Sequence, residues 1–238
     1  AIVAGVSVYV SSGDSGSQAG TTDSAYTVNY PSSSPYIISC GGTTLQLNPD
    51  GTTGAEFVWN SGSNGGTGGG VSTIYSKPAW QTGLTSTTYP ANTKSALSGR
   101  GLPDWSSNGD PASGYPVYYN GSYYQIGGTS AASPLLAGVT ARLNAITGRR
   151  LGFPNAKLYA HPKAFRDITS GNNACPNANG YSATTGWDAC TGLGTPNGIA
   201  FLNVATQPAT GLRWPRSNIN YRGNSGAKYP RPYIGASK

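Results

Sequence analysis

GGTSAASP occupies residues 127–134 and runs directly into LLAGVTARLNA at residues 135–145. The glycine pair allows a sharp turn or a close approach of the backbone to a ligand, and the apolar residues that follow recur at helical spacing. Pro134 is tolerated in the first turn of a helix, so we predict a helix from Ser130 to about Ala145. Ser130 would then lie where free N–H groups and the helix dipole favour developing negative charge.

Ser130 has two interpretations from these residues alone. It can be the N-cap of the helix, which is the common role of a serine at this position. It can also be a nucleophile, because the positive end of the helix dipole stabilises the charge that develops during attack.

Two further motifs contain aspartates. Residues 5–16 read GVSVYVSSGDSG, which is typical of a strand that ends in a turn carrying Asp14. FRDI at 165–168 and GWDACTGLG at 186–194 carry Asp167 and Asp188. Taken alone, each of these aspartates could simply stabilise a turn.

The three motifs, in this order, resemble those of the sedolisins, the serine-carboxyl peptidases of the subtilase clan. The resemblance implies an α/β fold with a subtilisin-like parallel sheet flanked by helices, lacking its N-terminal portion. It implies that Ser130 is the nucleophile and that Asp14, kept neutral by low pH and partial burial, donates a hydrogen bond to the oxyanion. The implied protein is an acid endopeptidase that cleaves protein or peptide substrates through an acyl-serine intermediate. It would be secreted, or reside in an acidic compartment.

The resemblance also implies one structural Ca²⁺ ion. Asp167 and Asp188 would supply carboxylate oxygens, and Ile168, Thr184 and Gly186 would supply backbone carbonyl oxygens. Calcium takes about six to eight oxygen ligands of this mixed kind. Position 184 is usually glycine in the family, so the threonine leaves the geometry of that ligand open.

No residue of this chain is expected to be the general base. The single histidine, His161, lacks the sequence context of a catalytic triad, and the single glutamate, Glu56, follows Asp14 in the chain. Sedolisins use a glutamate oriented by an aspartate upstream of the oxyanion aspartate, and no acidic residue precedes Asp14 here. We therefore expect an N-terminal segment of the same peptidase domain to supply the base. The alternative is an inactive peptidase fragment, or a remnant that binds peptide or glycan.

Composition is typical of a weakly charged, exported protein. Only 10% of the 238 residues are charged, against about 25% in an average soluble protein, which leaves few ion pairs for acid to break. Residues 207–238 hold six basic and no acidic side chains, so we expect a peptidase domain at 1–206 and a flexible basic tail at 207–238. Such a tail does not indicate nucleic-acid binding, and no apolar run is long enough to span a membrane.

The remaining pattern predicts strands alternating with helices. We expect strands at 35–47 and 56–59, a hairpin around Asn120-Gly121 and a last helix at 199–204, which favours a parallel sheet covered by helices. We also expect a disulfide between Cys175 and Cys190, and a buried thiol at Cys40.

Overall fold

The computed structural model describes residues 1–21, 26–175 and 179–207. The basic tail expected at 207–238 lies outside these residues apart from Gln207. The strands are Tyr9–Ser11 (β1), Ile38–Leu47 (β2), Thr53–Val58 (β3), Gly70–Val71 (β4), Thr85–Tyr89 (β5), Lys94–Ala96 (β6), Gly101–Leu102 (β7), Trp105–Asn108 (β8), Tyr115–Tyr119 (β9), Ser122–Ile126 (β10), Phe165–Arg166 (β11), Gly180–Tyr181 (β12) and Thr195–Pro196 (β13). The helices are Thr129–Thr147 (α1), Asn155–Tyr159 (α2) and Gly198–Thr206 (α3), with short 3₁₀ helices at Ile2–Ala4 (η1), Gly16–Gln18 (η2), Gly62–Asn64 (η3), Ala79–Gln81 (η4), Pro111–Ser113 (η5) and Pro162–Ala164 (η6).

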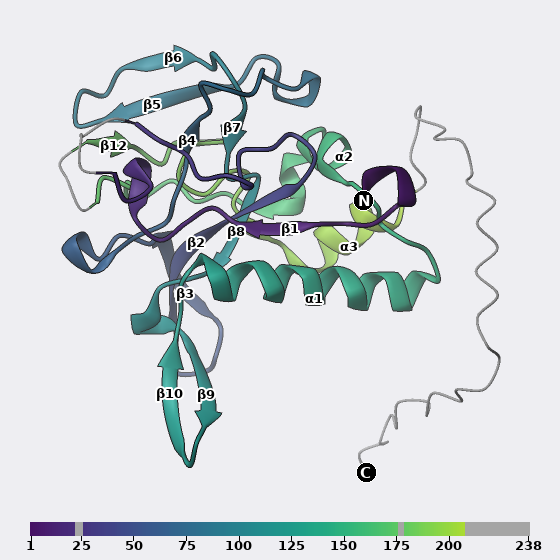
Figure 1. The fold of residues 1–238 in the computed structure, drawn as a ribbon. Coiled ribbons are helices and arrows are strands. Elements are labelled where there is room, and N and C mark those ends of the chain that lie inside the picture. The colour runs from purple at the N-terminus through teal and green to yellow at the C-terminus, as the bar shows by residue number, and fades with distance from the viewer. Residues whose placement is uncertain (22–25, 176–178, 208–238) are drawn as a thin grey trace, which may run out of the picture.

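A small parallel sheet lies at the centre of the molecule (Figure 1). Both β1 and β8 run parallel to β2, and β3 pairs with the second half of β2 as an antiparallel strand. β2 is buried from Ile38 to Thr44, which explains why the sequence ISCGGTT lacks the polar alternation of a half-exposed strand. The other paired strands form small antiparallel sheets around this centre.

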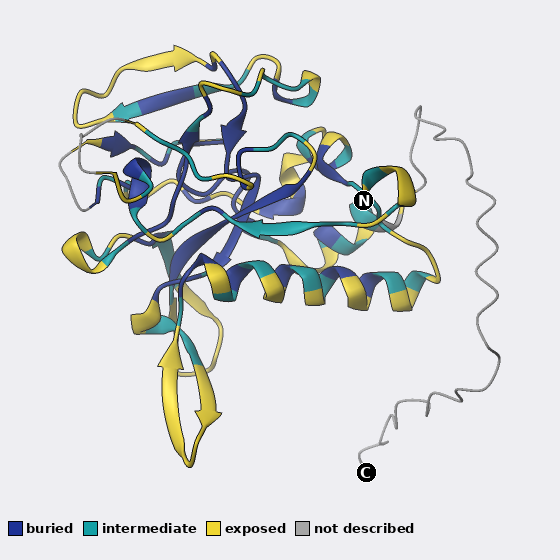
Figure 2. Cartoon of the chain, in the orientation of Figure 1, coloured by how far each residue is buried: buried dark blue, intermediate teal, exposed yellow. Residues whose placement is uncertain are grey.

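α1 packs against β1, β2 and β8 and covers one face of the central sheet (Figures 1 and 2). Its buried residues Ala132, Leu136 and Leu143 recur at helical spacing. The predicted helix is therefore confirmed, but Pro134 is its sixth residue and lies beyond the first turn. Because proline has no N–H, the carbonyl of Ser130 lacks the usual helical hydrogen bond from the residue four positions later.

Trp105 on β8 is the centre of an aromatic core. Its ring centroid lies 5.8 Å from Tyr9, 5.7 Å from Phe165 and 5.1 Å from Phe201. Tilted and edge-to-face contacts of this kind are favourable beyond the apolar area that they bury. The cluster ties β11 and α3, both late in the chain, to the central sheet.

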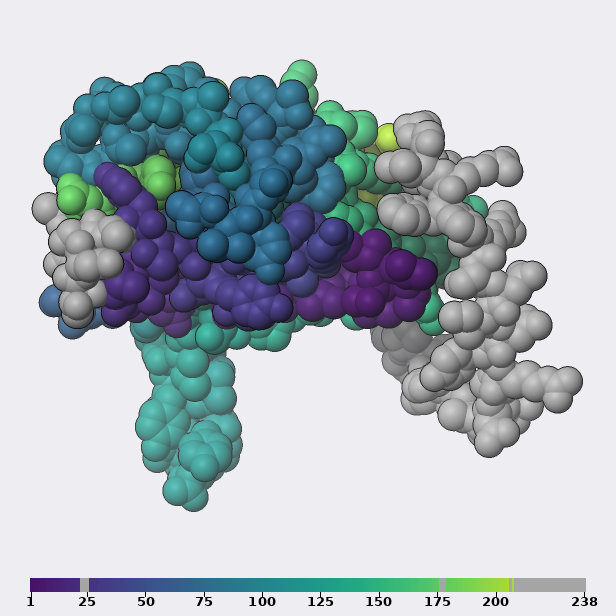
Figure 3. Space-filling view, turned by 45° about the horizontal axis from the view of Figure 1, so that its top comes forward, coloured from purple at the N-terminus to yellow at the C-terminus, as the bar shows by residue number. Residues whose placement is uncertain are grey.

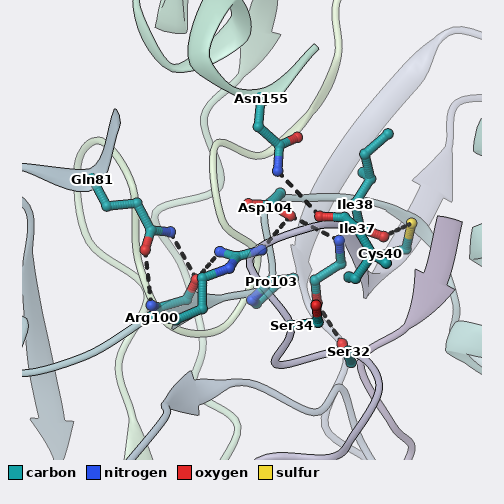
Figure 4. Close-up of polar contacts among 12 residues, drawn as sticks. Ser32, Ser34, Ile37, Ile38, Cys40, Gln81, Arg100, Pro103, Asp104 and Asn155 are labelled. Atoms are coloured by element: carbon teal, nitrogen blue, oxygen red, sulfur yellow. Dashed lines mark hydrogen bonds and ion pairs between the residues drawn. The ribbon is translucent and has the colours of Figure 1, made fainter. Parts of the chain in front are cut away.

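A buried ion pair fixes the segment that precedes β8 (Figure 4). Arg100 Nη2 lies 2.6 Å from Asp104 Oδ2, and both side chains are fully buried. The same Oδ2 accepts the Ser39 backbone N–H at 2.8 Å, and Oδ1 accepts the Tyr159 hydroxyl at 2.8 Å. Burial raises the pKa of Tyr159 well above its usual value, so its hydroxyl stays protonated as a donor. One carboxylate thus links β2, α2 and the start of β8.

The predicted disulfide is wrong, because Cys40, Cys175 and Cys190 are all buried free thiols. The Cys190 Sγ donates to the Tyr181 carbonyl at 3.0 Å, and the Cys175 Sγ packs so closely on Gly66 that a Cβ there would lie 2.5 Å away. Burial raises the pKa of the Cys175 thiol to about 11, and it raises the pKa of the Cys190 thiol well above its usual value. Spacing along the chain permits a bridge, but each sulfur fills its own place in the packing as a neutral thiol.

No helix in the described ranges combines the length and hydropathy of a membrane span.

We predict that Asp104→Ala destabilises the chain by about 3–5 kcal/mol, because it leaves the Arg100 guanidinium buried without its partner. Urea unfolding followed by tryptophan fluorescence measures the loss. Asp50→Ala is the matched control, since Asp50 is exposed and bonds only to nearby Thr52, and it should leave the unfolding midpoint unchanged. Equal midpoints for the two variants would show that the buried pair does not hold β8.

Candidate active site

Two segments 115 residues apart meet at the candidate active site. Asp14 follows β1, and Thr129 begins α1, which follows β8 through the β9–β10 hairpin. Because β1 and β8 both run parallel to β2, their carboxyl ends open at the same edge of the sheet, which is where ligands bind in α/β folds.

The carboxylate of Asp14 is held by Thr129. Its Oδ1 accepts hydrogen bonds from the backbone N–H and from the hydroxyl of Thr129, both at 2.7 Å. The Thr129 Oγ1 in turn accepts the Gly13 N–H at 3.1 Å. Thr129 is fully buried, whereas Asp14 is exposed. One carboxylate oxygen is therefore anchored in the protein, and the residue as a whole faces solvent.

Ser130 is exposed and is the second residue of α1. The N-cap interpretation of Ser130 is wrong, because the N-cap is Gly128 and no side chain caps this end of the helix. The serine hydroxyl thus lies in the first turn, directly after the residue that binds Asp14. The structure thus places Ser130 directly after the residue that holds the Asp14 carboxylate.

Gly128 allows this approach. Its φ of +91° is a conformation that residues with a side chain rarely adopt. A Cβ at this position would lie 2.7 Å from Asp14 Oδ2, well inside van der Waals contact. The second oxygen of Asp14 therefore packs against the backbone that leads into Ser130.

Glu56 and His161 are engaged elsewhere. Glu56 is largely buried, with Oε1 accepting the Thr43 hydroxyl at 2.8 Å and Oε2 accepting the Thr195 hydroxyl at 3.1 Å. His161 is exposed, and its Nδ1 lies 2.8 Å from the Lys157 carbonyl oxygen.

The residues of the predicted calcium site lie close together. The Gly186 N–H donates to Asp167 Oδ2 at 2.8 Å, and the Thr184 N–H donates to Asp188 Oδ2 at 3.1 Å. Ile168, next to Asp167, is buried. Within the described ranges no three His, Cys, Asp or Glu side chains cluster as metal ligands, so a cation here would depend on backbone carbonyls for its remaining ligands.

Asp188 gives a test of whether these residues fit a cation. Its side chain is 1% exposed, and neither ion pair of the described part of the chain includes it. Burial raises the pKa of Asp188 to about 7, although backbone N–H groups of Thr191 and Cys190 oppose the shift. Both of its oxygens accept protein donors, and a buried carboxylate without a cationic partner is a group that a cation such as Ca²⁺ would stabilise.

Comparison with known proteins identifies the family. The model of the Subtilase family matches residues 1–156. The chain is 46% identical over 209 residues to kumamolisin from Bacillus sp. (strain MN-32), covering 87% of this chain and 37% of the relative. It is 42% identical over 200 residues to sedolisin from Pseudomonas sp. (strain 101), covering 78% and 32%. The chain belongs to the subtilase family, and within it to the sedolisins.

A solved sedolisin structure confirms the predicted subtilisin-like α/β fold. Pseudomonas sedolisin, described as a serine-carboxyl proteinase complexed with two molecules of pseudo-iodotyrostatin, matches with a TM-score of 0.75 and 36% identity. The match covers 85% of this chain and 56% of that one. The chain spans about a third of the length of kumamolisin and sedolisin as curated. The activity of a whole sedolisin is therefore a proposal for this chain.

Sequence reasoning missed the role of Thr129. Its hydroxyl both donates to Asp14 and accepts from Gly13, so it connects the two motifs. The position of Thr129 in the motif, between the glycine pair and the serine, could have indicated a functional role. The local sequence does not indicate which distant residue it binds.

We predict opposite effects for two glycine-to-alanine changes in this region. Gly128→Ala should destabilise the chain by about 1–3 kcal/mol, because it combines strained φ with a clash against Asp14. Gly138→Ala, inside α1 with nothing within 4 Å of a Cβ, should stabilise the chain by about 0.5–1 kcal/mol. Urea unfolding measures both, and a neutral Gly128→Ala would contradict the close packing of Asp14 on this backbone.

Proposed function

We propose that this chain carries the nucleophile and the oxyanion-binding acid of an acid serine-carboxyl endopeptidase. The observation that carries the proposal is the pair of hydrogen bonds from Thr129 to Asp14, next to Ser130. These bonds hold one oxygen of the carboxyl group and so fix the orientation of the other. When that second oxygen is protonated, it can donate a hydrogen bond to a developing oxyanion. The description of a related structure as a serine-carboxyl proteinase agrees with this role.

The reaction would proceed by acyl transfer. The Ser130 Oγ attacks the carbonyl carbon of the scissile peptide bond, and its proton passes to a general base. Negative charge develops on the carbonyl oxygen, where the Asp14 O–H and the N-terminal end of α1 stabilise it. The amine then leaves with a proton, and water hydrolyses the acyl-serine by the same steps in reverse order.

The medium, rather than burial, would keep Asp14 protonated, because the side chain is exposed. This exposure corrects the idea that partial burial keeps the acid neutral. We therefore propose that the enzyme works in acid, on protein or peptide substrates, in a secreted form or in an acidic compartment. A carboxylate base suits the same conditions, since a base works best near its own pKa. We place that base in a segment of the peptidase domain outside residues 1–238.

Two substitutions test these roles in the full-length protein, assayed on a peptide substrate at about pH 4. Ser130→Ala should lower kcat at least about 10³-fold, because it removes the nucleophile. Asp14→Ala should lower kcat about 10²–10³-fold, because it removes the oxyanion donor.

Ser133→Ala, one turn further along α1, is the matched control and should retain activity. Mass spectrometry after an acid quench should place the acyl group on Ser130. Wild-type rates for Ser130→Ala would overturn the assignment of the nucleophile, and complete inactivity of the wild-type protein would favour the inactive remnant.

We also propose that Asp167 and Asp188, with the carbonyls of Ile168, Thr184 and Gly186, bind one structural Ca²⁺. The cation would join the segment after β11 to the loop that precedes β13, which it can do by neutralising two carboxylates at once. The closeness of the two segments, joined through Asp167 and Gly186, supports this proposal.

Calcium should raise the melting temperature of the chain, because a ligand bound only by the folded state stabilises it. Saturation at about 100 times Kd corresponds to about 2.7 kcal/mol. Differential scanning calorimetry in Ca²⁺ and in EGTA measures the shift. Asp167→Asn should abolish the difference, whereas Asp50→Asn, at an exposed aspartate, should retain it. Equal melting temperatures of the wild-type chain in both buffers would exclude the site.

A further inference from the structure

β9 and β10 form a hairpin that projects from the body of the molecule (Figures 1 and 3). Every residue from 116 to 126 is exposed (Figure 2), and four of them are tyrosines. An isolated two-stranded hairpin is at best marginally stable in water. Exposed aromatic patches on soluble proteins commonly mark interaction sites. This hairpin is therefore a candidate site for binding a partner molecule.

One face of the hairpin contacts the body of the molecule at its base. Tyr118 and Tyr123 are direct cross-strand partners, and their ring centroids lie 4.9 Å apart. Because side chains alternate along a strand, Gln125 lies on the same face, two residues nearer the body. The Gln125 Nε2 donates to the Ala112 carbonyl at 2.8 Å, which ties this face to η5.

A cavity of about 390 Å³ opens at the base of this face, between Leu45 and Leu47 of β2 on one side and Ser113 and Gln125 on the other. One edge of β2 is only partly covered here. Thr43 pairs with both β3 and β8, so these strands flank β2 on opposite edges, and the pairing with β8 ends at Thr43. Among the described residues, no strand continues along the β8 edge to Leu47, and the Leu45 N–H bonds to Ser113 Oγ at 3.2 Å.

We propose that the cavity beside the end of β2 and the Tyr118–Tyr123 face form a docking surface for an extended, uncharged segment of a polypeptide substrate. Beyond Leu45 no strand of the described residues covers this edge of β2, and an extended polypeptide is the natural complement of an open strand edge. No charged residue occurs at 43–47 or at 111–128. The surface therefore disfavours charged segments, because burying an unpaired charge against it is costly.

We infer that a substrate occupies this docking surface, because the surface is continuous with the candidate active site. This inference rests on the proposed function. β10 ends at Ile126, and only Gly127, Gly128 and Thr129 separate it from Ser130. A strand advances about 3.3 Å per residue, so Tyr123 lies about 10 Å beyond Ile126. The segment that docks on the tyrosine pair thus lies several residues away from the bond that is cleaved.

The first test compares two substrates of the full-length protein in acid. One is a short cleavable peptide, and the other is the same peptide extended on both sides by uncharged Val, Thr and Tyr residues. The double substitution Tyr118→Ser with Tyr123→Ser should raise KM for the extended peptide about tenfold and leave the short peptide unchanged. Tyr36→Ser, at an exposed tyrosine outside the hairpin, should leave both unchanged. An unchanged KM for the extended peptide would overturn the proposal.

The second test separates docking from catalysis. Binding of the labelled extension peptide is measured by fluorescence anisotropy with a Ser130→Ala protein, so that the peptide is not cleaved during the measurement. Leu47→Lys places a charge at the open β2 edge and should weaken binding about tenfold, as should the tyrosine pair substitution.

If the wild-type protein shows no peptidase activity but the hairpin-dependent binding is retained, the proposed function is refuted and the docking surface stands. If the wild-type protein is active but peptide binding does not depend on the hairpin, the docking surface is refuted and the proposed function stands. Two results would overturn the choice of a polypeptide substrate. One is displacement of the labelled peptide by cellohexaose, and the other is a dimer in sedimentation that the tyrosine substitutions dissociate.

Discussion

The hydrogen bonds between Asp14 and Thr129 are the contact on which the candidate site depends. They join the end of β1 to the start of α1, two segments 115 residues apart. The contact forms because β1 and β8 both run parallel to β2, and because a glycine on β2 leaves room beside it. A Cβ at Gly42 would lie 2.9 Å from Trp59 and 3.4 Å from the Thr129 methyl. Sheet register, a small residue and one threonine together place Asp14 against the residue that precedes Ser130.

Carboxylates in this protein are held mostly by neutral donors. Asp14 is bound by Thr129, Asp110 by Thr44 and Ala112, and Asp188 by backbone N–H groups. The described part of the chain contains two ion pairs, of which only Arg100–Asp104 is fully buried. Because few ion pairs exist to be lost on protonation, the low content of charged residues is compatible with work in acid.

The motifs predicted the elements of the site, but not the contacts between them. The helix after Ser130, the buried strand at 35–47 and the hairpin at Asn120-Gly121 follow from local periodicity and turn chemistry, and the structure contains all three. The anchor at Thr129 and the free thiols in place of a disulfide depend on three-dimensional packing. Local sequence carries no information on which distant group a buried hydroxyl or sulfur will meet.

A crystal structure of the full-length protein with a peptide aldehyde, grown in acid, tests the central claim most directly. An aldehyde forms a hemiacetal with an active-site serine and so mimics the tetrahedral intermediate. The account predicts a covalent bond from Ser130 Oγ to the aldehyde carbon, with the hemiacetal oxygen within hydrogen-bond distance of the Asp14 carboxyl while Thr129 still binds Oδ1. A hemiacetal oxygen that faces another donor, with Asp14 turned away, would contradict it.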